Sequence, residues 1–465
     1  MKLQIKYRAT AICMATIMPL ALMLSGCGQT SDGTNEQGFA GGDGTKENPY
    51  QIATEEQLNL INNDLSANYE LTADIDLSGT EDWIPIGAMT LDSINKDNGE
   101  IDFTNAFAGS FDGQGHTISN LSCIADDDAV AAGLFGCVTG NVQNFTLENV
   151  IVTGNANNMA IGGAIGYGLG DVKNITLSGE NTVTGTNCVG GIVGGNQGTI
   201  DSCTVENGNI VIIGDNDFSS GEIIQCDVAE CGGLVVGGSF MGEVNNCDAT
   251  GNVTAEGNEP VGLGGIAGCI QCAASINGNT VTATINAGNG HAIGGLCGFA
   301  GMGDDGDGTV DEPCAITDCS ADVTIVSDGA THVGGLVGTG LYYYGMEDRY
   351  TVENCKVTGT IDGATTPGTV AGRAAGSTII SCDTDVLIDG TKGDTQIGAT
   401  TKLYQGGDHD ADKKQAETAV QLDAISDTYQ QLFEGATFEA KCDGYWHDAA
   451  AGQNNSYCRA SPFMA

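Results

Sequence analysis

Short stretches of alternating apolar and polar residues recur along most of the chain, separated by glycine-rich runs. Segments such as VKNITLSG, IDSCTVENG and VENCKVTGTI place apolar or β-branched residues at every second position, a pattern typical of β-strands with one buried face. Runs of the form Gly-Gly-apolar-apolar-Gly and short polar turns precede these strands, and no helical spacing lies between copies. The pattern predicts a chain built from short β-strands.

The glycine-rich runs form an internal repeat. Aligned on the second glycine of each pair, the copies lie at Gly133, Gly163, Gly191, Gly233, Gly265, Gly295 and Gly335, with a degenerate copy at Thr369. The intervals are 30, 28, 42, 32, 30, 40 and 34 residues, so the basic unit is about 30 residues with two long insertions. Two or three strands per unit indicate one coil of a solenoid. We predict an all-β fold, a parallel β-helix of about 8–10 coils.

The recurrence also decides what the glycines do. A phosphate-binding loop is normally a single feature between one strand and one helix, whereas HVGGLVG at 332–338 has an equivalent in every unit. We therefore interpret the glycines as sites of close backbone approach and of tight turning with positive φ.

Both ends of the predicted solenoid carry helical signals. Thr54-Glu55-Glu56-Gln57 has the form of a capping box and predicts a short helix that covers the first coil. Near the other end, Leu422, Ile425, Tyr429 and Leu432 follow helical spacing, and the segment 442–458 with Trp446 is a second candidate cap. A disulfide between Cys442 and Cys458 is a hypothesis.

The N-terminus predicts export. Lys2, Lys6 and Arg8 precede an apolar run over 9–24, the layout of a secretory signal. The run ends in Leu-Ser-Gly-Cys, which resembles a bacterial lipobox, with Cys27 as the lipidation site; the alternative is an ordinary cleaved signal whose cysteine is incidental. Residues 27–46 are polar and glycine-rich, as expected of a flexible tether.

Charge narrows the range of partners. The net charge is −45, and without residues 1–26 the chain keeps 12 basic and 60 acidic side chains, a net charge of −48. This balance argues against nucleic acid and anionic lipid surfaces as partners. The predicted contact with the membrane runs through the N-terminal lipid alone.

Cysteines recur at one position of the repeat. Setting aside Cys13 and Cys27 leaves 16 of the 18 cysteines, an even number that permits disulfides in an exported protein. One set shares its repeat position with apolar residues and with a threonine: Cys203, Cys247, Cys319, Cys355 and Cys382 align with Phe145, Ile175 and Thr280. We interpret these thiols as buried packing groups; ladder disulfides and a metal cluster are the alternatives.

Two further cysteine pairs stand in or near loops. They are Cys226 with Cys231, and Cys269 with Cys272. The second pair is a CxxC, which without a partner CxxC is weak evidence for zinc or redox chemistry.

Two long insertions between a glycine pair and the following Asn-Cys strand are candidate binding loops: this spacing is 12 residues in several units, but 24 from Gly295 to Cys319 and 20 from Gly335 to Cys355. GDDGDGTVDEP at 303–313 resembles part of a calcium loop through Asp305, Asp307 and Asp311, although two ligands of the full pattern, including the bidentate acid, are missing. The alternatives are a calcium site and a solvated acidic loop, and we predict no other cofactor.

The second insertion contains LYYYGMEDRY, with Tyr342, Tyr343, Tyr344 and Arg349. Both insertions fall at the same turn of adjacent units, so we expect them side by side on one edge. Aromatic side chains on a rigid scaffold suit binding to glycan or protein; alternatively, some of the tyrosines pack on the neighbouring loop.

Several of these phrases resemble the GLUG-motif proteins of bacterial surfaces. The likeness covers about residues 45–400 and includes ENPYQIATEEQLNLI, YELTADIDLSG, WIPIG, FAGSFDGQGHTISNL and the repeated GGLVG with its Asn-Cys strand. The resemblance implies a right-handed parallel β-helix and a surface role. GLUG repeats also accompany zinc metallopeptidases, but the five histidines never form the HExxH pattern that a zincin site needs.

These observations together predict a non-catalytic, adhesin-like surface lipoprotein that contacts glycan or a host or matrix protein. The alternative is a polysaccharide-active β-helix enzyme, a hydrolase rather than a lyase, because only three arginines remain beyond the signal. The predicted segments are a signal peptide (1–26), a tether (27–46), an N-terminal cap with the first coils (47–122), the repeat solenoid (123–400) and a C-terminal cap (401–465).

Overall fold

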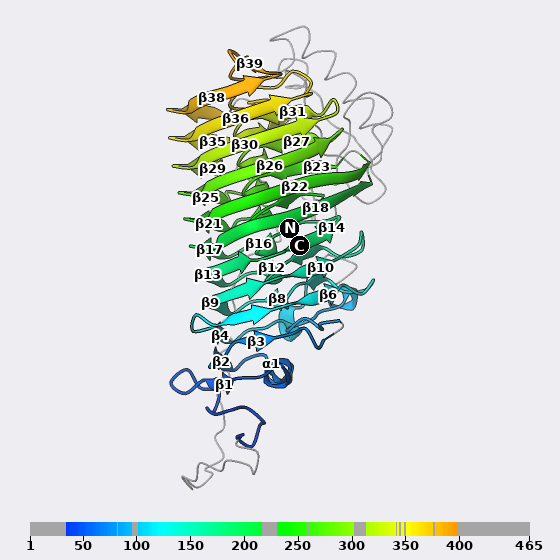
Figure 1. Cartoon of the computed structure of the whole chain (residues 1–465), viewed down its shortest axis with the longest axis vertical. Helices are drawn as coiled ribbons and strands as arrows, with labels where there is room; N and C mark the ends of the chain where they lie inside the picture. Colours follow the sequence, from blue (N-terminus) through cyan, green and yellow to red (C-terminus); the bar gives the residue numbers. More distant parts are fainter. Residues whose placement is uncertain are drawn as a thin grey trace, which may run out of the picture.

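The chain folds into a stack of β-strand coils along one long axis. In the computed structural model the stack runs from β1 and α1 at one end to β38 and β39 at the other (Figure 1). The structure describes residues 34–80, 82–94, 101–215, 230–258, 260–301, 313–340, 342–343, 346–347, 350–374 and 377–398. Within these residues no helix is long and apolar enough to cross a membrane.

Two seven-stranded parallel sheets hold the glycine pairs and the residues around them. The β7–β31 sheet consists of β7 (Ala131–Ala132), β11 (Ala160–Gly162), β15 (Val189–Gly190), β19 (Gly232–Gly233), β23 (Val261–Gly264), β27 (His291–Gly294) and β31 (Thr331–Gly334). The β8–β32 sheet consists of β8 (Phe135–Val138), β12 (Ile165–Gly168), β16 (Val193–Asn196), β20 (Val236–Phe240), β24 (Ala267–Gln271), β28 (Cys297–Ala300) and β32 (Val337–Thr339).

A 23-stranded sheet closes each coil and is made of two ladders; β9 (Asn141–Glu148) and β13 (Asp171–Ser178) belong to the first and extend into the second. The first ladder holds β1 (Tyr50–Ile52), β2 (Asn68–Leu71), β4 (Ser110–Asp112), β9 (Asn141–Glu148), β13 (Asp171–Ser178), β17 (Thr199–Asp201), β21 (Glu243–Asn245), β25 (Ser275–Asn277), β29 (Cys314–Thr317), β35 (Tyr350–Glu353) and β37 (Thr378–Ile380). The second holds β3 (Ile75–Asp76), β5 (Thr117–Ser119), β6 (Ser122–Ile124), β10 (Ile151–Thr153), β14 (Thr182–Gly185), β18 (Thr204–Asp215), β22 (Asp248–Asn258), β26 (Thr280–Gly288), β30 (Ser320–Ser327), β36 (Lys356–Asp362), β38 (Asp383–Ile388) and β39 (Thr391–Lys392).

The stacked strands pair in parallel, which confirms the predicted parallel β-helix. For example, β26 pairs with β30 through Val281↔Ala321 and Ile285↔Ile325. Along β26 buried positions alternate with more exposed ones. Antiparallel pairing within the named strands is confined to β38 with β39, at the end of the stack, and β33 (Tyr342–Tyr343) with β34 (Met346–Glu347).

Each glycine of the Gly-Gly-apolar-apolar-Gly run touches a different piece of backbone. A Cβ on Gly294 would lie 2.0 Å from the carbonyl oxygen of Cys297, and one on Gly295 would lie 2.1 Å from that of Gly335 in the next coil. A Cβ on Gly298 would lie 2.5 Å from the backbone of Gly262 in the preceding coil. The prediction of close approach is therefore confirmed. The expected positive φ is wrong for these three glycines, whose φ lies outside that region.

Left-handed residues stand instead at the corner within the large sheet. Their φ values lie between 51° and 69°, and the residues are Asn144, Asn174, Ser202, Asn246, Gly278, Asp318, Asn354 and Ser381. Asparagine, aspartate and glycine tolerate this conformation best, and the next residue of each coil is buried or half-buried. The Asn-Cys motif thus encodes a corner followed by an inward side chain.

Helix α1 (Glu55–Asn59) forms where the capping box predicts it. Thr54 Oγ1 accepts a hydrogen bond from Gln57 N at 3.3 Å, while Gln57 Oε1 accepts from Ala53 N at 2.8 Å, one residue earlier than a standard box. The helix continues as the 3₁₀ turn η1 (Leu60–Asn63), and the other short 3₁₀ turns are η2 (Leu91–Ser93) and η3 (Phe103–Asn105). The predicted C-terminal cap lies outside the described residues.

Candidate binding face

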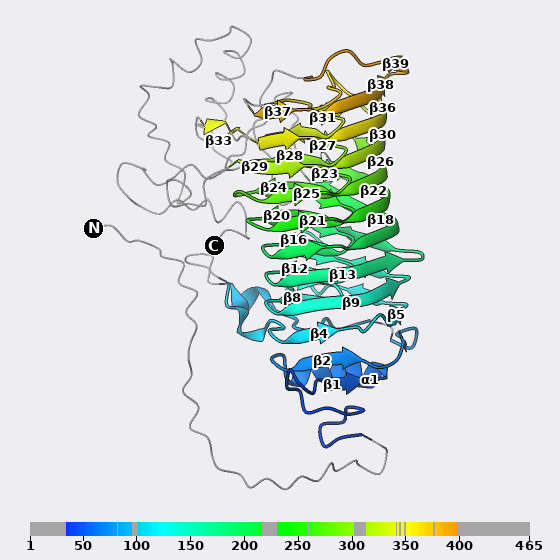
Figure 2. The ribbon, with the colours of Figure 1, turned by 90° about the vertical axis from the view of Figure 1, so that its left-hand side faces the viewer.

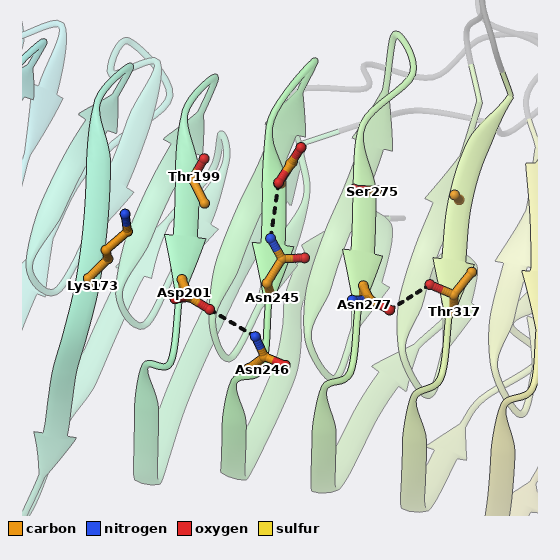
Figure 3. A pocket seen from close by; sticks show the side chains of 10 residues that line it. Lys173, Thr199, Asp201, Asn245, Asn246, Ser275, Asn277 and Thr317 are labelled. Carbon is orange, nitrogen blue, oxygen red and sulfur yellow. Dashed lines mark hydrogen bonds between the residues drawn. The ribbon is translucent and has the colours of Figure 1, made fainter.

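A band of polar side chains covers the outer face of β13, β17, β21, β25 and β29. It is called the polar stripe here and comprises Lys173, Thr199, Asp201, Glu243, Asn245, Asn246, Ser275, Asn277, Ala315 and Thr317, which line an open hollow of about 610 Å³ (Figure 3). On the same strands, the residues between these outward positions point into the core and are fully buried: Ile200, Val244 and Ile276. Strand alternation therefore places every second residue on the outer face.

All residues of the stripe except Asn246 form two rows, because the strands are in parallel register. One row runs through Thr199, Glu243, Ser275 and Ala315, and the other through Lys173, Asp201, Asn245, Asn277 and Thr317. Neighbouring members of a row are one strand spacing apart, about 4.8 Å. Amide, hydroxyl and carboxylate groups therefore repeat at a regular interval along the solenoid axis.

Hydrogen bonds within the stripe orient its side chains. Asn246 Nδ2 donates to Asp201 Oδ1 at 2.9 Å, and Thr317 Oγ1 donates to Asn277 Oδ1 at 2.8 Å, each across adjacent coils (Figure 3). Asn245 Nδ2 donates to a Glu243 carboxylate oxygen at 3.1 Å. Such restraints reduce the conformational entropy that these side chains lose when they contact a ligand.

Lys173 supplies the positive charge of the stripe. Its Nζ lies 2.8 Å from Asp171 Oδ2, and both side chains are substantially exposed. The hydrogen bond and charge of Asp171 raise the pKa of Lys173, so the ammonium group is charged at neutral pH.

The two long insertions leave the solenoid at one corner. Residues 301–313 lie between β28 and β29, and residues 340–349 lie between β32 and β35. Because β28 pairs with β32 and β29 pairs with β35, the points where the insertions begin and end are adjacent. The polar stripe reaches this corner, since Ala315 and Thr317 lie on β29.

Few of the predicted site residues fall within the described chain. Tyr342 and Tyr343 form β33, which pairs with Met346 and Glu347 of β34 and lies beside the stack (Figure 2). Outside the described residues are Cys27, Tyr344, Arg349, Asp305, Asp307 and Asp311. The predicted calcium and tyrosine contacts therefore stay predictions.

The aligned cysteines are free thiols inside the solenoid. Cys203, Cys247, Cys319 and Cys355 are buried and Cys382 is half-buried, with no disulfide among them, which agrees with the interpretation as packing groups. No group of three or more metal-ligating side chains was found in the described part of the chain. The alignment with Thr280 is wrong by one residue: register places Asn279 in the column, because Asn245 pairs with Asn277 and Asp248 with Thr280.

Each sulfur of the column also makes polar contacts. Cys247 and Cys319 donate to the carbonyl oxygens of Asn245 at 3.3 Å and Thr317 at 3.0 Å, two residues before each. Cys319 Sγ in turn accepts from Asn279 N at 3.3 Å, in the preceding coil. A thiol fits this position because it is small, apolar and able both to donate and to accept.

Sequence reasoning missed the polar stripe. Its signal was available in the outward positions of the short strands before each Asn-Cys corner, such as Thr199 with Asp201 and Glu243 with Asn245. Solvent-facing polar residues are normal on any half-buried strand, so only the register, which stacks them in rows, distinguishes a stripe from an ordinary surface.

Comparisons with known proteins support the assignment of the glycine-rich repeat. The family model described as "The GLUG motif" matches residues 329–362. Halomucin of Haloquadratum walsbyi is 37% identical over 168 residues, covering 35% of this chain and 2% of that protein. A Gly-rich membrane protein of Evansella cellulosilytica is 33% identical over 148 residues, covering 30% of this chain and 15% of that protein.

Two solved structures are also similar. A crystal structure of an immunoglobulin A1 protease from Bacteroides ovatus aligns with 80% of this chain and 87% of its own, at 18% identity and a TM-score of 0.35. A second IgA1 protease aligns with 65% of this chain and 21% of its own, at 18% identity and a TM-score of 0.38. The segments matched by sequence cover only small parts of the two relatives. This chain is identified as one that carries a GLUG motif within a parallel β-helix.

Proposed function

We propose that this protein is a lipid-anchored, non-catalytic binding protein of the cell surface that contacts a glycan with the polar stripe and the neighbouring insertions. The stripe supports the proposal because amide, hydroxyl and carboxylate groups repeat along the solenoid axis at one strand spacing. A linear chain of sugars offers hydroxyl groups at a similarly regular interval. Extended solenoid surfaces commonly serve such binding.

The charge of the stripe narrows the ligand. Asp201 and Glu243 face the hollow together with a single lysine, Lys173. Carboxylates repel polyuronates and sulfated chains, and their oxygens accept hydrogen bonds from hydroxyl groups. The expected ligand is therefore a neutral or amino-bearing polysaccharide.

A glycan-array screen with the mature chain, in calcium and in chelator, tests this function. We expect binding that falls at least tenfold in the double variant Asn245→Ala with Asn277→Ala. The matched control is Thr282→Ala, an exposed residue of β26 that does not line the hollow, and it should bind as the wild type does.

A triple variant, Tyr342→Ala with Tyr343→Ala and Tyr344→Ala, separates the insertion from the stripe. Loss of binding in this variant alone would place the contact on the insertion. Shortening of the bound glycan would assign the protein to the hydrolases. Absence of binding to every glycan on the array would overturn the proposal.

The proposed anchor has its own test. Cys27→Ala removes the thiol that receives the lipid, so we expect the variant to move from the membrane fraction into the soluble exported fraction. Ser25→Ala keeps the thiol and a small residue in the signal and should leave the protein in the membrane fraction. Membrane retention of Cys27→Ala would contradict the anchor and leave the polar stripe untouched.

A further inference from the structure

A second apolar cluster lies where the two seven-stranded sheets pack against each other. It includes three fully buried cysteines, Cys188, Cys231 and Cys269, together with aromatic residues such as Tyr167 and Phe299. The sheets approach each other closely here. A Cβ on Gly268 would lie only 2.2 Å from the backbone of Gly232 in the preceding coil.

Facing residues in this cluster are matched in size. Gly262 faces Phe299, whose ring would lie 2.8 Å from a Cβ on the glycine, and Gly238 faces Cys188, whose sulfur would lie 3.0 Å away. At the next step of the stack Cys231 faces Cys269, and their sulfurs are 3.3 Å apart. Two small side chains meet there.

We propose that Cys231 and Cys269 form a disulfide in the mature exported protein, joining the β7–β31 sheet of one coil to the β8–β32 sheet of the next. The two thiols lose two protons and two electrons, one S–S bond forms, and a disulfide-bearing oxidant is reduced to two thiols. The proposal rests on the predicted export, because an oxidising compartment supplies oxidants of this class.

Cys188 is the competing partner, with its sulfur 3.5 Å from that of Cys231. The two residues directly precede the paired positions Val189 and Gly232, but Cys188 has a positive φ of 39° that Cys231 does not share. Cys269 instead approaches Cys231 from the facing sheet. The shorter separation between the two sulfurs, 3.3 Å, favours the facing pair. Cys188 then stays a thiol.

Burial fixes when the bond forms. Cys231 and Cys269 are fully buried, so an oxidant reaches them before the coils close during folding. Reduction of a disulfide requires an external thiolate to attack one of its sulfurs, and the complete burial of both residues keeps such a reagent away from the bond in the folded chain. The link should therefore resist reduction until the chain unfolds.

Peptide mapping of the full exported chain tests the proposal. The protein is purified without reductant, unfolded in the presence of iodoacetamide and cleaved at acidic residues. Cleavage after Glu230 and Glu243 releases Cys231 as the single cysteine of its peptide. We expect that peptide to be linked to Cys269, two hydrogens lighter than the two free peptides together, with tandem fragmentation separating Cys269 from Cys272 and Cys297.

The stacked thiols Cys203 and Cys247 serve as an internal control and should be alkylated. The Cys188→Ser variant should keep the link, and Cys269→Ser should lose it and leave Cys231 alkylated. Alkylated Cys231 in the wild type, or its linkage to Cys188, Cys226 or Cys272, would overturn the proposal, and that result does not depend on whether any variant folds.

Discussion

The backbone N–H of Cys247 donates to Oδ1 of Asn279 at 2.8 Å, and Asn279 occupies in its coil the buried position that cysteine occupies in the coils on either side. Asn279 Nδ2 also donates to the carbonyl oxygen of Val244 at 2.8 Å. The amide thus satisfies two backbone groups of the preceding coil, inside a core where an unsatisfied group is costly.

Replacement of Asn279 by alanine should lower the free energy of unfolding by about 2–4 kcal/mol, because both backbone groups lose their partner and a cavity remains. Asn279→Cys should cost less, since a sulfur can accept from Cys247 N as Cys319 Sγ accepts from Asn279 N. Urea denaturation measures both values. Equal losses for alanine and cysteine would show that the acceptor is unimportant.

The thiol column makes a related prediction at Cys319. Cys319→Ala should destabilise the protein by about 1–3 kcal/mol, because the Asn279 N–H and the Thr317 carbonyl lose the sulfur. Cys319→Ser keeps both a donor and an acceptor and should cost less than alanine. The reverse order in urea denaturation would assign the cysteine to apolar packing alone.

Glycine substitutions should separate close approach from ordinary contact. Gly295→Ala places a Cβ 2.1 Å from the carbonyl oxygen of Gly335, so the coils must move apart, and we expect a loss of at least about 3 kcal/mol or failure to fold. Gly168→Ala is the matched control, because its Cβ meets only side chains at 3.6 Å and 3.7 Å. Its change should stay below about 1 kcal/mol; a thermal melt that falls equally for both variants would contradict the account.

Acid should destabilise the protein through His291. Burial, followed by the nearby His332, lowers the pKa of His291 to about 3, whereas the unfolded chain takes up the proton near pH 6.5. The neutral imidazole therefore makes its full contribution to the free energy of unfolding above about pH 6.5. As the pH falls from there toward 3, this contribution is lost by up to about 1.4 kcal/mol per pH unit.

His291→Gln removes this titration while keeping a polar side chain beside Thr331, whose Oγ1 lies 2.7 Å from His291 Nδ1. Denaturation between pH 7 and pH 4 should give a shallower pH dependence for this variant than for the wild type. His116→Gln, which changes a partly exposed imidazole, serves as the control. Parallel pH profiles for the wild type and His291→Gln would contradict the assignment.

The sequence allowed the solenoid to be predicted because its signals are local and repeated. Period-2 strands, glycine pairs and Asn-Cys corners each specify one part of a coil, and the structure contains each of them. The misplaced Thr280 shows the limit of that reasoning: the copy around Asn279 lacks the cysteine that marks the column, so counting along the chain slipped by one residue.

The polar stripe and the facing thiols could not be predicted in the same way. Asn245 and Asn277 become neighbours of a row only through strand pairing, and Cys231 contacts Cys269 because the two seven-stranded sheets approach each other closely at glycines. Such contacts join residues more than thirty positions apart and depend on how many residues each insertion adds. The insertions themselves interrupt the period that would reveal the register.

The glycine contacts also limit how the length of the molecule can change. Gly295 rests on the carbonyl of Gly335, and Gly298 rests on the backbone of Gly262, so every coil is fitted to the one on each side. Part of a coil cannot be removed without breaking these contacts, whereas a whole unit can be gained or lost, with a change in height of about 4.8 Å. Duplication and deletion of coding segments would therefore alter the reach of this protein in discrete steps.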